Sequence, residues 1–349
     1  MVRGYSLLFS FTIDGQPCQY ETGTDIARET ISGSSNSYFI TGKNIESKYG
    51  KVLGLPKEST LIIDDGESAK SLESYGRVMS WLMENGAGRN STLAYIGGGT
   101  VGDLAGFVAS TFKRGMNLVA IPTTFLSMID SSIGGKNGIN LNGVKNMAGT
   151  FLNPSRIVAD TSFIKDNTPL IMAGLPEAIK HGFIKDRWII DKLDKNNFED
   201  PGFLEEFIIH NARIKAEICS LDPYDTLGTR SLLNFGHTVG HWIESSSKNR
   251  INHGEAVMMG MFMESTVTSA MGLTENTVPE KIRLLGEKLG IPTKIPDSII
   301  VTDLTHMEYD KKINGDDIYL PVVTSPGNSK IVRMKLKDLK SQIEKAMVG

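Results

Sequence analysis

The sequence predicts two unlike halves: an α/β domain over residues 1–157 and a mainly α-helical domain over residues 158–349. Three observations support this division. Short apolar segments typical of buried strands alternate with helical patterns up to about residue 160. A glycine-rich run directly follows one of these strands, and beyond residue 160 segments with helical spacing take over. The length of 349 residues also exceeds that of a typical single core, so two domains are expected.

The composition argues against several classes of protein. A formal net charge of −3 and a pI near 6.1 give no support for binding to nucleic acid or to an anionic membrane. No apolar run approaches the roughly 20 residues that span a bilayer, and no signal-peptide cleavage site follows the N-terminal apolar run. Cys18 and Cys219 cannot form a disulfide framework, so the reducing cytoplasm is the expected compartment.

The first half carries one candidate nucleotide site. Strands are predicted at residues 6–13, 37–42, 91–96 and 117–124, and a helix at 71–85. The third of these strands leads into Gly97-Gly98-Gly99, and a further helix is expected from residue 104. Strand, glycine-rich turn and helix point backbone N–H groups at a phosphate, which is typical of a Rossmann-like nucleotide-binding domain.

Two alternatives remain open at this turn. The spacing is not GxGxxG, so the glycines have a purely structural interpretation of about equal weight. Asp103, just beyond them, is also explained as a first-turn acid favoured by the helix dipole.

A second polar loop, residues 130–140, follows the strand that ends in Thr123-Thr124 and contains Lys136. Lys145-Asn146 comes soon after it. Such side chains usually face solvent, but beyond a strand end they are well placed to bind an anionic substrate.

The segment 232–255 contains three of the six histidines. His237 and His241 are spaced i, i+4 and share one face of a helix, while His253 opens the next apolar segment. Two helices joined by a loop would bring the three together, and clustered imidazoles suit a zinc-type ion. The spacing alone favours His237 and His241 as the metal-binding pair, and a capping or core role for one or two of these histidines is the alternative.

Other cationic and acidic residues surround this segment in the sequence. Glu177 and Lys180 at i, i+3 would be an ordinary surface ion pair if taken alone, but beside a histidine cluster Glu177 becomes the leading carboxylate ligand. A helix at 203–221 carries Lys215, and Arg230 stands four residues before Asn234, on the expected face of the His237 helix. Such a cationic pocket suits a substrate with a carboxylate and a phosphate.

Taken together, these segments resemble the 3-dehydroquinate synthases, a family of sugar-phosphate cyclases related to the metal-dependent polyol dehydrogenases. The resemblance runs from about Ser37 to the final helix, predicted at 336–348. It rests on GGGTVGDLAGFVAS, IPTTFLSMIDSSIGGKNGIN, GLPEAIKHG, LLNFGHTVGH and HGEAV. It implies a dehydroquinate synthase-like fold, with an NAD-binding first domain and a helical second domain that binds zinc and substrate.

The resemblance also implies roles for individual residues. The zinc ligands, with cobalt as a possible substitute, would be Glu177, His237 and His253. The catalytic residues would be Lys136, Lys180, Lys215, Arg230, Asn234 and His241. The substrate would also be bound by Asp130, Lys145, Asn146, Lys311 and Lys312. NAD would be bound near Asn44, Glu67, Lys70, Gly98, Gly99, Asp103, Thr123, Thr124 and Thr161. Arg114 would reach into the neighbouring subunit's phosphate pocket, which implies a homodimer.

The implied reaction converts 3-deoxy-D-arabino-heptulosonate 7-phosphate to 3-dehydroquinate and phosphate in the shikimate pathway. Its steps would be transient oxidation by NAD, β-elimination, re-reduction and an intramolecular aldol. The alternatives are another sugar-phosphate cyclase of the inosose or valiolone type, a zinc-dependent NAD(P) polyol dehydrogenase, and a non-enzymatic binding protein. One departure is Gly42, where family members usually carry Asp, and this suggests partial tolerance of NADP.

Overall fold

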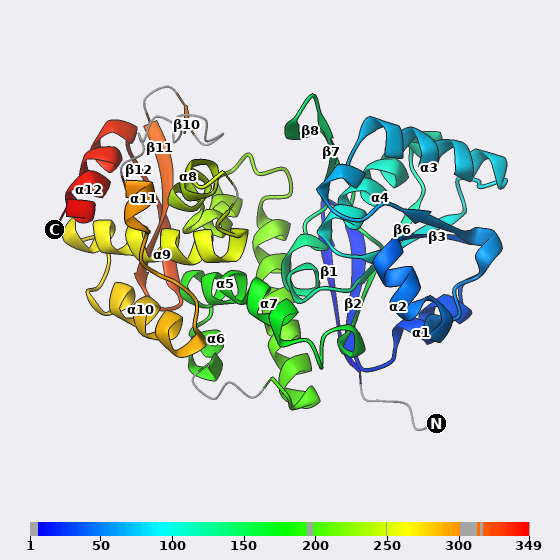
Figure 1. The fold of residues 1–349 in the computed structure, drawn as a ribbon, viewed down its shortest axis with the longest axis horizontal. Helices are drawn as coiled ribbons and strands as arrows, with labels where there is room; N and C mark the ends of the chain where they lie inside the picture. Colours follow the sequence, from blue (N-terminus) through cyan, green and yellow to red (C-terminus); the bar gives the residue numbers. More distant parts are fainter. Residues whose placement is uncertain (1–5, 194–197, 249, 301–312, 315–316, 349) are drawn as a thin grey trace. The chain divides into compact units, whose positions relative to one another are not determined.

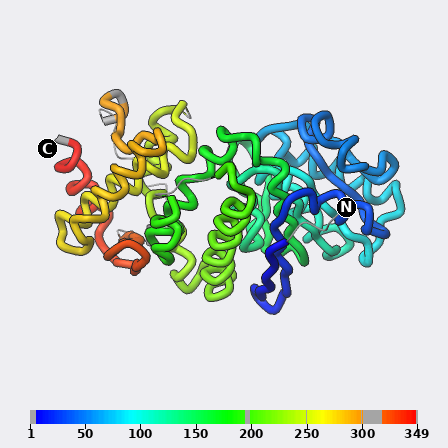
Figure 2. Tube along the Cα trace, turned by 90° about the horizontal axis from the view of Figure 1, so that it is seen from below, coloured from blue at the N-terminus to red at the C-terminus, as the bar shows by residue number. Residues whose placement is uncertain are grey.

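The computed structural model describes residues 6–348 except 194–197, 249, 301–312 and 315–316 (Figure 1). The chain forms two compact units, one of residues 1–171 with 197–223 and the other of residues 172–196 with 224–349. This division does not fall at the predicted boundary after residue 157. The first unit takes in helix α7 (Pro201–Leu221) because α7 packs against the first two strands; in Figure 2 the dark-blue hairpin lies beside it.

The first unit is built on a seven-stranded sheet with the strand order β1-β2-β9-β6-β5-β3-β4. All neighbours pair in parallel except β1 and β2, as the strand–helix alternation predicted for a nucleotide-binding-type sheet. The strands are β1 (Leu7–Ile13), β2 (Gln16–Gly23), β3 (Ser37–Gly42), β4 (Thr60–Ile63), β5 (Thr92–Gly97), β6 (Asn117–Pro122) and β9 (Arg156–Asp160).

The register of this sheet aligns the ends of its central strands. Gly97 of β5 is paired with Pro122 of β6, and Thr41 of β3 with Ile96 of β5. The loops after these three strands therefore leave the sheet at one edge, where ligands of open α/β sheets bind. Of the residues expected to bind the nucleotide, Gly98, Thr123 and Thr124 lie in these loops, and Asn44 and Gly99 lie in the first turns of the helices that follow, α2 and α4.

Helices and a hairpin complete the first unit. They are α1 (Ala27–Ser32), α2 (Lys43–Leu53), α3 (Leu72–Glu84), α4 (Gly99–Thr111), α7, and the hairpin of β7 (Lys136–Leu141) with β8 (Val144–Phe151). Helix α4 begins at Gly99 and not near residue 104. Of the three glycines, Gly97 ends β5, Gly98 is the extended N-cap residue, and Gly99 is the first helical residue. Asp103 consequently lies in the second turn, so its explanation as a first-turn acid is wrong.

The second unit is mainly helical. Its elements are residues 172–184 of α5 (Thr168–Ile184), α6 (Arg187–Leu193), η6 (Thr229–Asn234), α8 (His237–Ser246), α9 (His253–Ala270), α10 (Thr277–Leu289), α11 (Asp297–Ile300), β10 (Ile313–Asn314), β11 (Asp317–Ser325), β12 (Asn328–Lys335) and α12 (Leu336–Val348). Strands β11 and β12 form an antiparallel hairpin. Buried side chains of α8, α9, β11 and α12, such as Trp242, Met259, Ile318 and Leu339, form one core.

Helices α8 and α9 pack backbone against backbone. A Cβ at Gly260 of α9 would lie 1.9 Å from the carbonyl oxygen of Gly236, and one at Gly240 of α8 would lie 3.1 Å from the carbonyl oxygen of Ala256. At Gly260 only glycine permits so close an approach, and at Gly240 a Cβ would be tighter than an ordinary contact. Because His237 and His253 are the first residues of α8 and α9, this contact places the two histidines near each other.

Candidate functional site

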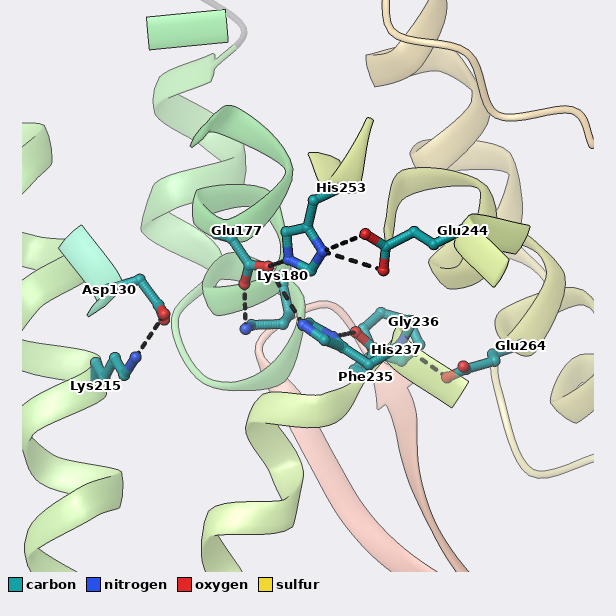
Figure 3. Close-up of polar contacts among 10 residues, drawn as sticks. All are labelled: Asp130, Glu177, Lys180, Lys215, Phe235, Gly236, His237, Glu244, His253 and Glu264. Carbon is teal, nitrogen blue, oxygen red and sulfur yellow. Dashed lines mark hydrogen bonds and ion pairs between the residues drawn. The ribbon is translucent and has the colours of Figure 1, made fainter. Parts of the chain in front are cut away.

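The second unit brings together one acid and two histidines from three helices. One ligand atom from each of Glu177, His237 and His253 lies within 4.8 Å of the other two (Figure 3). The Oε1 atom of Glu177 is 3.2 Å from Nε2 of His253 and 3.4 Å from Nε2 of His237. Across the described residues, no other group of three or more histidine, cysteine or acidic side chains meets this spacing.

His241 does not belong to this cluster. Its ring centroid is 5.5 Å from that of His237, edge to face, so the i, i+4 pair is close. The donor that completes the described cluster is nevertheless His253, from the next helix. The geometry therefore favours a Glu-His-His set over a chelate formed by His237 and His241.

Hydrogen bonds orient both rings of the cluster. Nδ1 of His237 is 3.2 Å from the carbonyl oxygen of Phe235, which leaves Nε2 facing Glu177. Nδ1 of His253 is 3.4 Å from Glu244, on α8, while its Nε2 faces Glu177. Second partners of this kind fix the tautomer and orientation of metal-binding histidines. Glu244 carried no sequence signal, because only the packing of α8 on α9 reveals its contact.

Charge in the cluster is tightly balanced. Burial works to raise the pKa of Glu177, but Lys180 and the two histidines hold the pKa of that carboxyl well below its usual range. Burial lowers the pKa of His237 despite the nearby Glu177. Burial also works to lower the pKa of His253, but its contacts with Glu177 and Glu244 raise it to about 10.

The donor set fits a divalent ion of the zinc type. One carboxylate and two imidazoles converge, and zinc accepts three protein ligands with one position left for water or substrate. His253 holds a positive charge between two acids at neutral pH, so the site is built to accommodate a cation. A metal ion would replace that proton.

Lys180 is not the solvent-exposed residue that its i, i+3 spacing from Glu177 would allow. Its side chain contacts Glu177, and both are 3% exposed. An ordinary solvent-exposed ion pair is therefore excluded, and Lys180 lies directly beside the cluster.

Arg230 and Asn234 lie on a separate short helix, η6, and not on the His237 helix as expected. Gly236 separates η6 from α8. Its φ of 82° is a left-handed backbone conformation that suits glycine and that neither helix can continue through. Arg230 is buried in the second unit.

The first unit carries a second polar cluster near the glycine-rich turn. Nζ of the buried Lys70 is 2.6 Å from Oδ2 of Asp103, 2.5 Å from Oδ1 of Asn146 and 3.7 Å from Oε1 of Glu67. Burial raises the pKa of Asp103 even though Lys70 opposes it. Asn140 joins the set, because its side chain donates to Glu67 at 2.9 Å and accepts the N–H of Asn146 at 2.9 Å. The sequence interpretation gave Asn140 no role.

Other predicted residues of the first unit have varied settings. Lys215 of α7 pairs with Asp130 at 2.5 Å. Thr161 is fully buried, and its hydroxyl bonds with that of Thr24 at 2.8 Å. The hydroxyl of Thr124 bonds with Ser127 at 2.7 Å, whereas Thr123 is buried. The exposed residues are Asn44, Arg114, Lys136 and Lys145. Lys311 and Lys312 lie outside the described residues.

Among the helices of the described chain, none combines the length and the apolar character that crossing a membrane requires.

Solved structures define the class of fold. A 2-deoxy-scyllo-inosose synthase, solved with carbaglucose-6-phosphate, NAD+ and Co2+, superposes with a TM-score of 0.84 at 23% identity, covering 98% of this chain and 99% of the other. The 2-epi-5-epi-valiolone synthase of Streptomyces hygroscopicus, solved with NAD+ and Zn2+, gives 0.79 at 22% identity, covering 99% of both chains. An iron-containing alcohol dehydrogenase gives 0.65 at 15% identity, covering 97% and 99%. The fold is that of the sugar-phosphate cyclases.

The sequence comparisons identify the family within this class. Residues 60–170 match the N-terminal domain and residues 174–313 the C-terminal domain of 3-dehydroquinate synthase. The 3-dehydroquinate synthase of Thermoplasma volcanium is 39% identical over 338 residues, which cover 94% of this chain and 93% of that protein. That of Picrophilus torridus is 40% identical over 322 residues, covering 90% and 91%. The chain belongs to the 3-dehydroquinate synthase family.

Proposed function

We propose that this enzyme converts 3-deoxy-D-arabino-heptulosonate 7-phosphate to 3-dehydroquinate and inorganic phosphate, the reaction of its family. The observation that carries the proposal is the convergence of Glu177, His237 and His253 in a chain that is 39% identical to a 3-dehydroquinate synthase over 94% of its length. The likeness to the family spans both units, including the glycine-rich turn and the histidine segment.

The proposed metal ion is zinc, with cobalt able to substitute, and its ligands are Glu177, His237 and His253. When bound, such an ion lowers the pKa of a coordinated hydroxyl and stabilises developing negative charge on oxygen. The lowered pKa of His237 supports this role, because a metal ligand must be a neutral imidazole.

The proposed nucleotide is NAD, which supplies a temporary hydride acceptor, so that no net oxidation results. The N-terminus of α4 at Gly98-Gly99 would bind its pyrophosphate through backbone N–H groups. The remaining residues proposed to bind NAD are Asn44, Glu67, Lys70, Asp103, Thr123, Thr124 and Thr161. The ion pair of Lys70 with Asp103 supports this assignment, because it holds Lys70 against α4, the helix that follows the glycine-rich turn.

The proposed role of His241 is to take the proton of the reacting hydroxyl, for which an imidazole is suited near neutral pH. Substrate carboxylate and phosphate would be held by cationic and amide side chains that need no movement during the reaction. The proposed catalytic residues besides His241 are Lys136, Lys180, Lys215, Arg230 and Asn234. The other residues proposed to bind substrate are Asp130, Lys145, Asn146, Lys311 and Lys312. The Asp130–Lys215 ion pair supports a fixed position for that lysine.

We further propose a homodimer in which Arg114 contacts the phosphate pocket of the partner subunit. Arg114 is exposed and follows Lys113, both with positive φ (68° and 49°), so the turn between α4 and β6 presents this side chain outward. The thiols of Cys18 and Cys219 are buried and not joined in a disulfide, which supports a reducing cytoplasmic location.

Incubation of the protein with the heptulosonate phosphate, NAD+ and Zn2+ tests the proposal. Phosphate and 3-dehydroquinate should appear in equal amounts without accumulation of NADH, and a chelator should stop both. Stoichiometric NADH without phosphate would indicate a polyol dehydrogenase instead. Phosphate release only from hexose or sedoheptulose phosphates would indicate a cyclase of the inosose or valiolone type.

A further inference from the structure

Glu264 is a fully buried acid on α9 that none of the proposed chemistry uses (Figure 3). A carboxylate in the interior costs several kcal/mol unless hydrogen bonds compensate for its lost hydration. Its position eleven residues along the helix that begins with His253 calls for a physical explanation.

Both carboxylate oxygens of Glu264 accept backbone hydrogen bonds from the start of α8. The N–H of Gly236 donates to Oε2 at 2.8 Å, and the N–H of Val239 donates to Oε1 at 3.1 Å. The first N–H groups of a helix have no partner within it, and its positive dipole end favours a carboxylate. Gly236 has no side chain with which to cap α8, so an acid from another helix provides the cap.

His237 lies between the two residues that Glu264 binds. The cap therefore holds the backbone on both sides of this histidine, including the turn at Gly236 with its φ of 82°. The same turn carries the carbonyl group of Phe235, which lies 3.2 Å from Nδ1 of His237 and orients its ring.

The glycine contacts between α8 and α9 give this cap little freedom to move. A Cβ at Gly236 would lie 2.7 Å from the carbonyl oxygen of Val257, and one at Gly260 would lie closer still, 1.9 Å from the carbonyl oxygen of Gly236. Glu264 is thus attached to a rigid helix whose first residue is His253.

We propose that Glu264 is a positioning residue for the Glu177–His237–His253 cluster, acting through the backbone of His237. It holds Nε2 of His237 at the correct distance from Glu177, and it fixes this histidine to the helix that carries His253. The inference rests on the proposed metal site. It adds to the three ligands a residue that would contact neither the metal nor the substrate.

The test is titration of metal-free Glu264→Gln with Co2+, followed by visible absorption, with circular dichroism as the check of folding. Glutamine has nearly the same shape, but its NH2 group would face one of the two backbone N–H groups, so the cap is half lost. We expect Co2+ binding to be weakened by about 10- to 100-fold, with an altered visible spectrum. Glu264→Asp, which keeps the charge on a shorter side chain, should have intermediate affinity and serves if the glutamine variant does not fold.

Thr268→Val is the matched control. Thr268 is buried one turn further along α9, where its hydroxyl bonds with that of Thr274 at 2.7 Å and donates to the backbone carbonyl of Glu264 at 2.8 Å, without touching the carboxylate that caps α8. This variant should bind Co2+ like the wild type. In the background of His237→Ala, Glu264→Gln should have no further effect, because the residue it positions is absent.

The outcomes separate the inference from the proposed function. If the wild type binds no Co2+, the metal site itself is wrong. If the wild type binds Co2+ and Glu264→Gln matches it in affinity and spectrum, Glu264 has no positioning role. Equal weakening in Thr268→Val, or full weakening in the His237→Ala background, would also overturn the inference.

Discussion

Lys180 lies one helical turn from Glu177 on α5, and the two side chains form an ion pair that is 3% exposed at each partner. The cation belongs to the same helix as the proposed ligand, so the pair is formed within α5 alone. Burial works to raise the pKa of Glu177, and the charge of Lys180 is the largest influence that lowers it.

Lys180→Met should destabilise the metal-free protein, because a buried carboxylate loses its neighbouring charge. Breaking such a pair typically costs about 3–5 kcal/mol in the free energy of unfolding. Added Zn2+ should restore much of this loss, since the ion supplies positive charge to the same carboxylate. Urea unfolding with and without Zn2+ measures both effects. Lys185→Met, an exposed position just past the end of α5, is the control and should show neither effect.

The stability of the metal-free protein should fall as the pH rises above neutrality. The pKa of His253 is about 10 in the folded protein and about 6.5 in the unfolded chain, so the folded state binds this proton more tightly. The stabilising contribution is therefore complete below about pH 6.5 and is lost progressively as the pH approaches 10. His237, with a lowered pKa, acts in the opposite sense, and its contribution is lost as the pH falls.

Urea unfolding of the metal-free protein between pH 7 and 10 measures the contribution of His253. The variant His253→Gln should show a flatter dependence in this range. Parallel curves for the variant and the wild type would contradict the assignment of the titration to His253.

His253→Ala and His241→Ala should have different consequences for the metal. The first removes a member of the described cluster, so the protein should lose its metal on dialysis. The second leaves the cluster complete, so metal should be retained while turnover is lost. Metal content after dialysis, measured by emission spectrometry, separates the two. Equal loss of metal in both variants would restore the chelate formed by His237 and His241.

The sequence predicted the strands of the α/β first half and several of the long helices, because both follow from the spacing of apolar residues. The histidine cluster was harder to predict. Spacing pairs His237 with His241, but the partner that completes the cluster depends on the contact of Gly236 with Gly260, which periodicity does not encode. The resemblance to the family decided for His253 over His241, whereas Glu177 was already the leading carboxylate ligand from the residues alone.

Burial was the other quantity that the sequence could not provide. The spacing of Glu177 and Lys180 is the same for a surface pair and for a buried one, and only the packing of α5 shows which is present. Glu264 resembles any acid in a helix until its contacts with Gly236 and Val239 are seen. Asn140 was likewise one polar residue of a loop, although it links Glu67 to Asn146.

Asp65 should determine the preference for NAD over NADP. Gly42 suggested partial tolerance of NADP, but Oδ1 of Asp65 lies 2.3 Å from the position of a Cβ at Gly42. Its carboxylate also accepts the N–H of Asn44 at 3.1 Å. Asp65 follows β4 and lies beside Gly42 at the end of β3, and an acid in this position repels the 2′-phosphate of NADP. The Asp65→Asn variant should therefore bind NADP about 5- to 10-fold more tightly than the wild type. Asp64→Asn is the matched control, since Asp64 pairs with Lys43 instead. The dissociation constant for NADPH, measured by its fluorescence, should fall in Asp65→Asn and stay at the wild-type value in Asp64→Asn.

Arg114 should act in the active site of the other subunit, so two inactive variants should complement each other. Arg114→Ala and His241→Ala would each be inactive as homodimers. After the two are mixed in equal amounts and allowed to exchange subunits, half of the dimers are mixed, and each of these contains one intact site. The expected activity is about a quarter of that of the wild type.

Two controls make this complementation decisive. Mixing Lys180→Ala with His241→Ala should restore no activity, because both residues lie in the second unit of the chain and are proposed for the same subunit's active site. Size-exclusion chromatography with light scattering should show a dimer before and after mixing. A monomeric protein, or mixtures of Arg114→Ala and His241→Ala that stay inactive despite proven exchange of subunits, would place Arg114 in its own subunit's site or outside the site altogether.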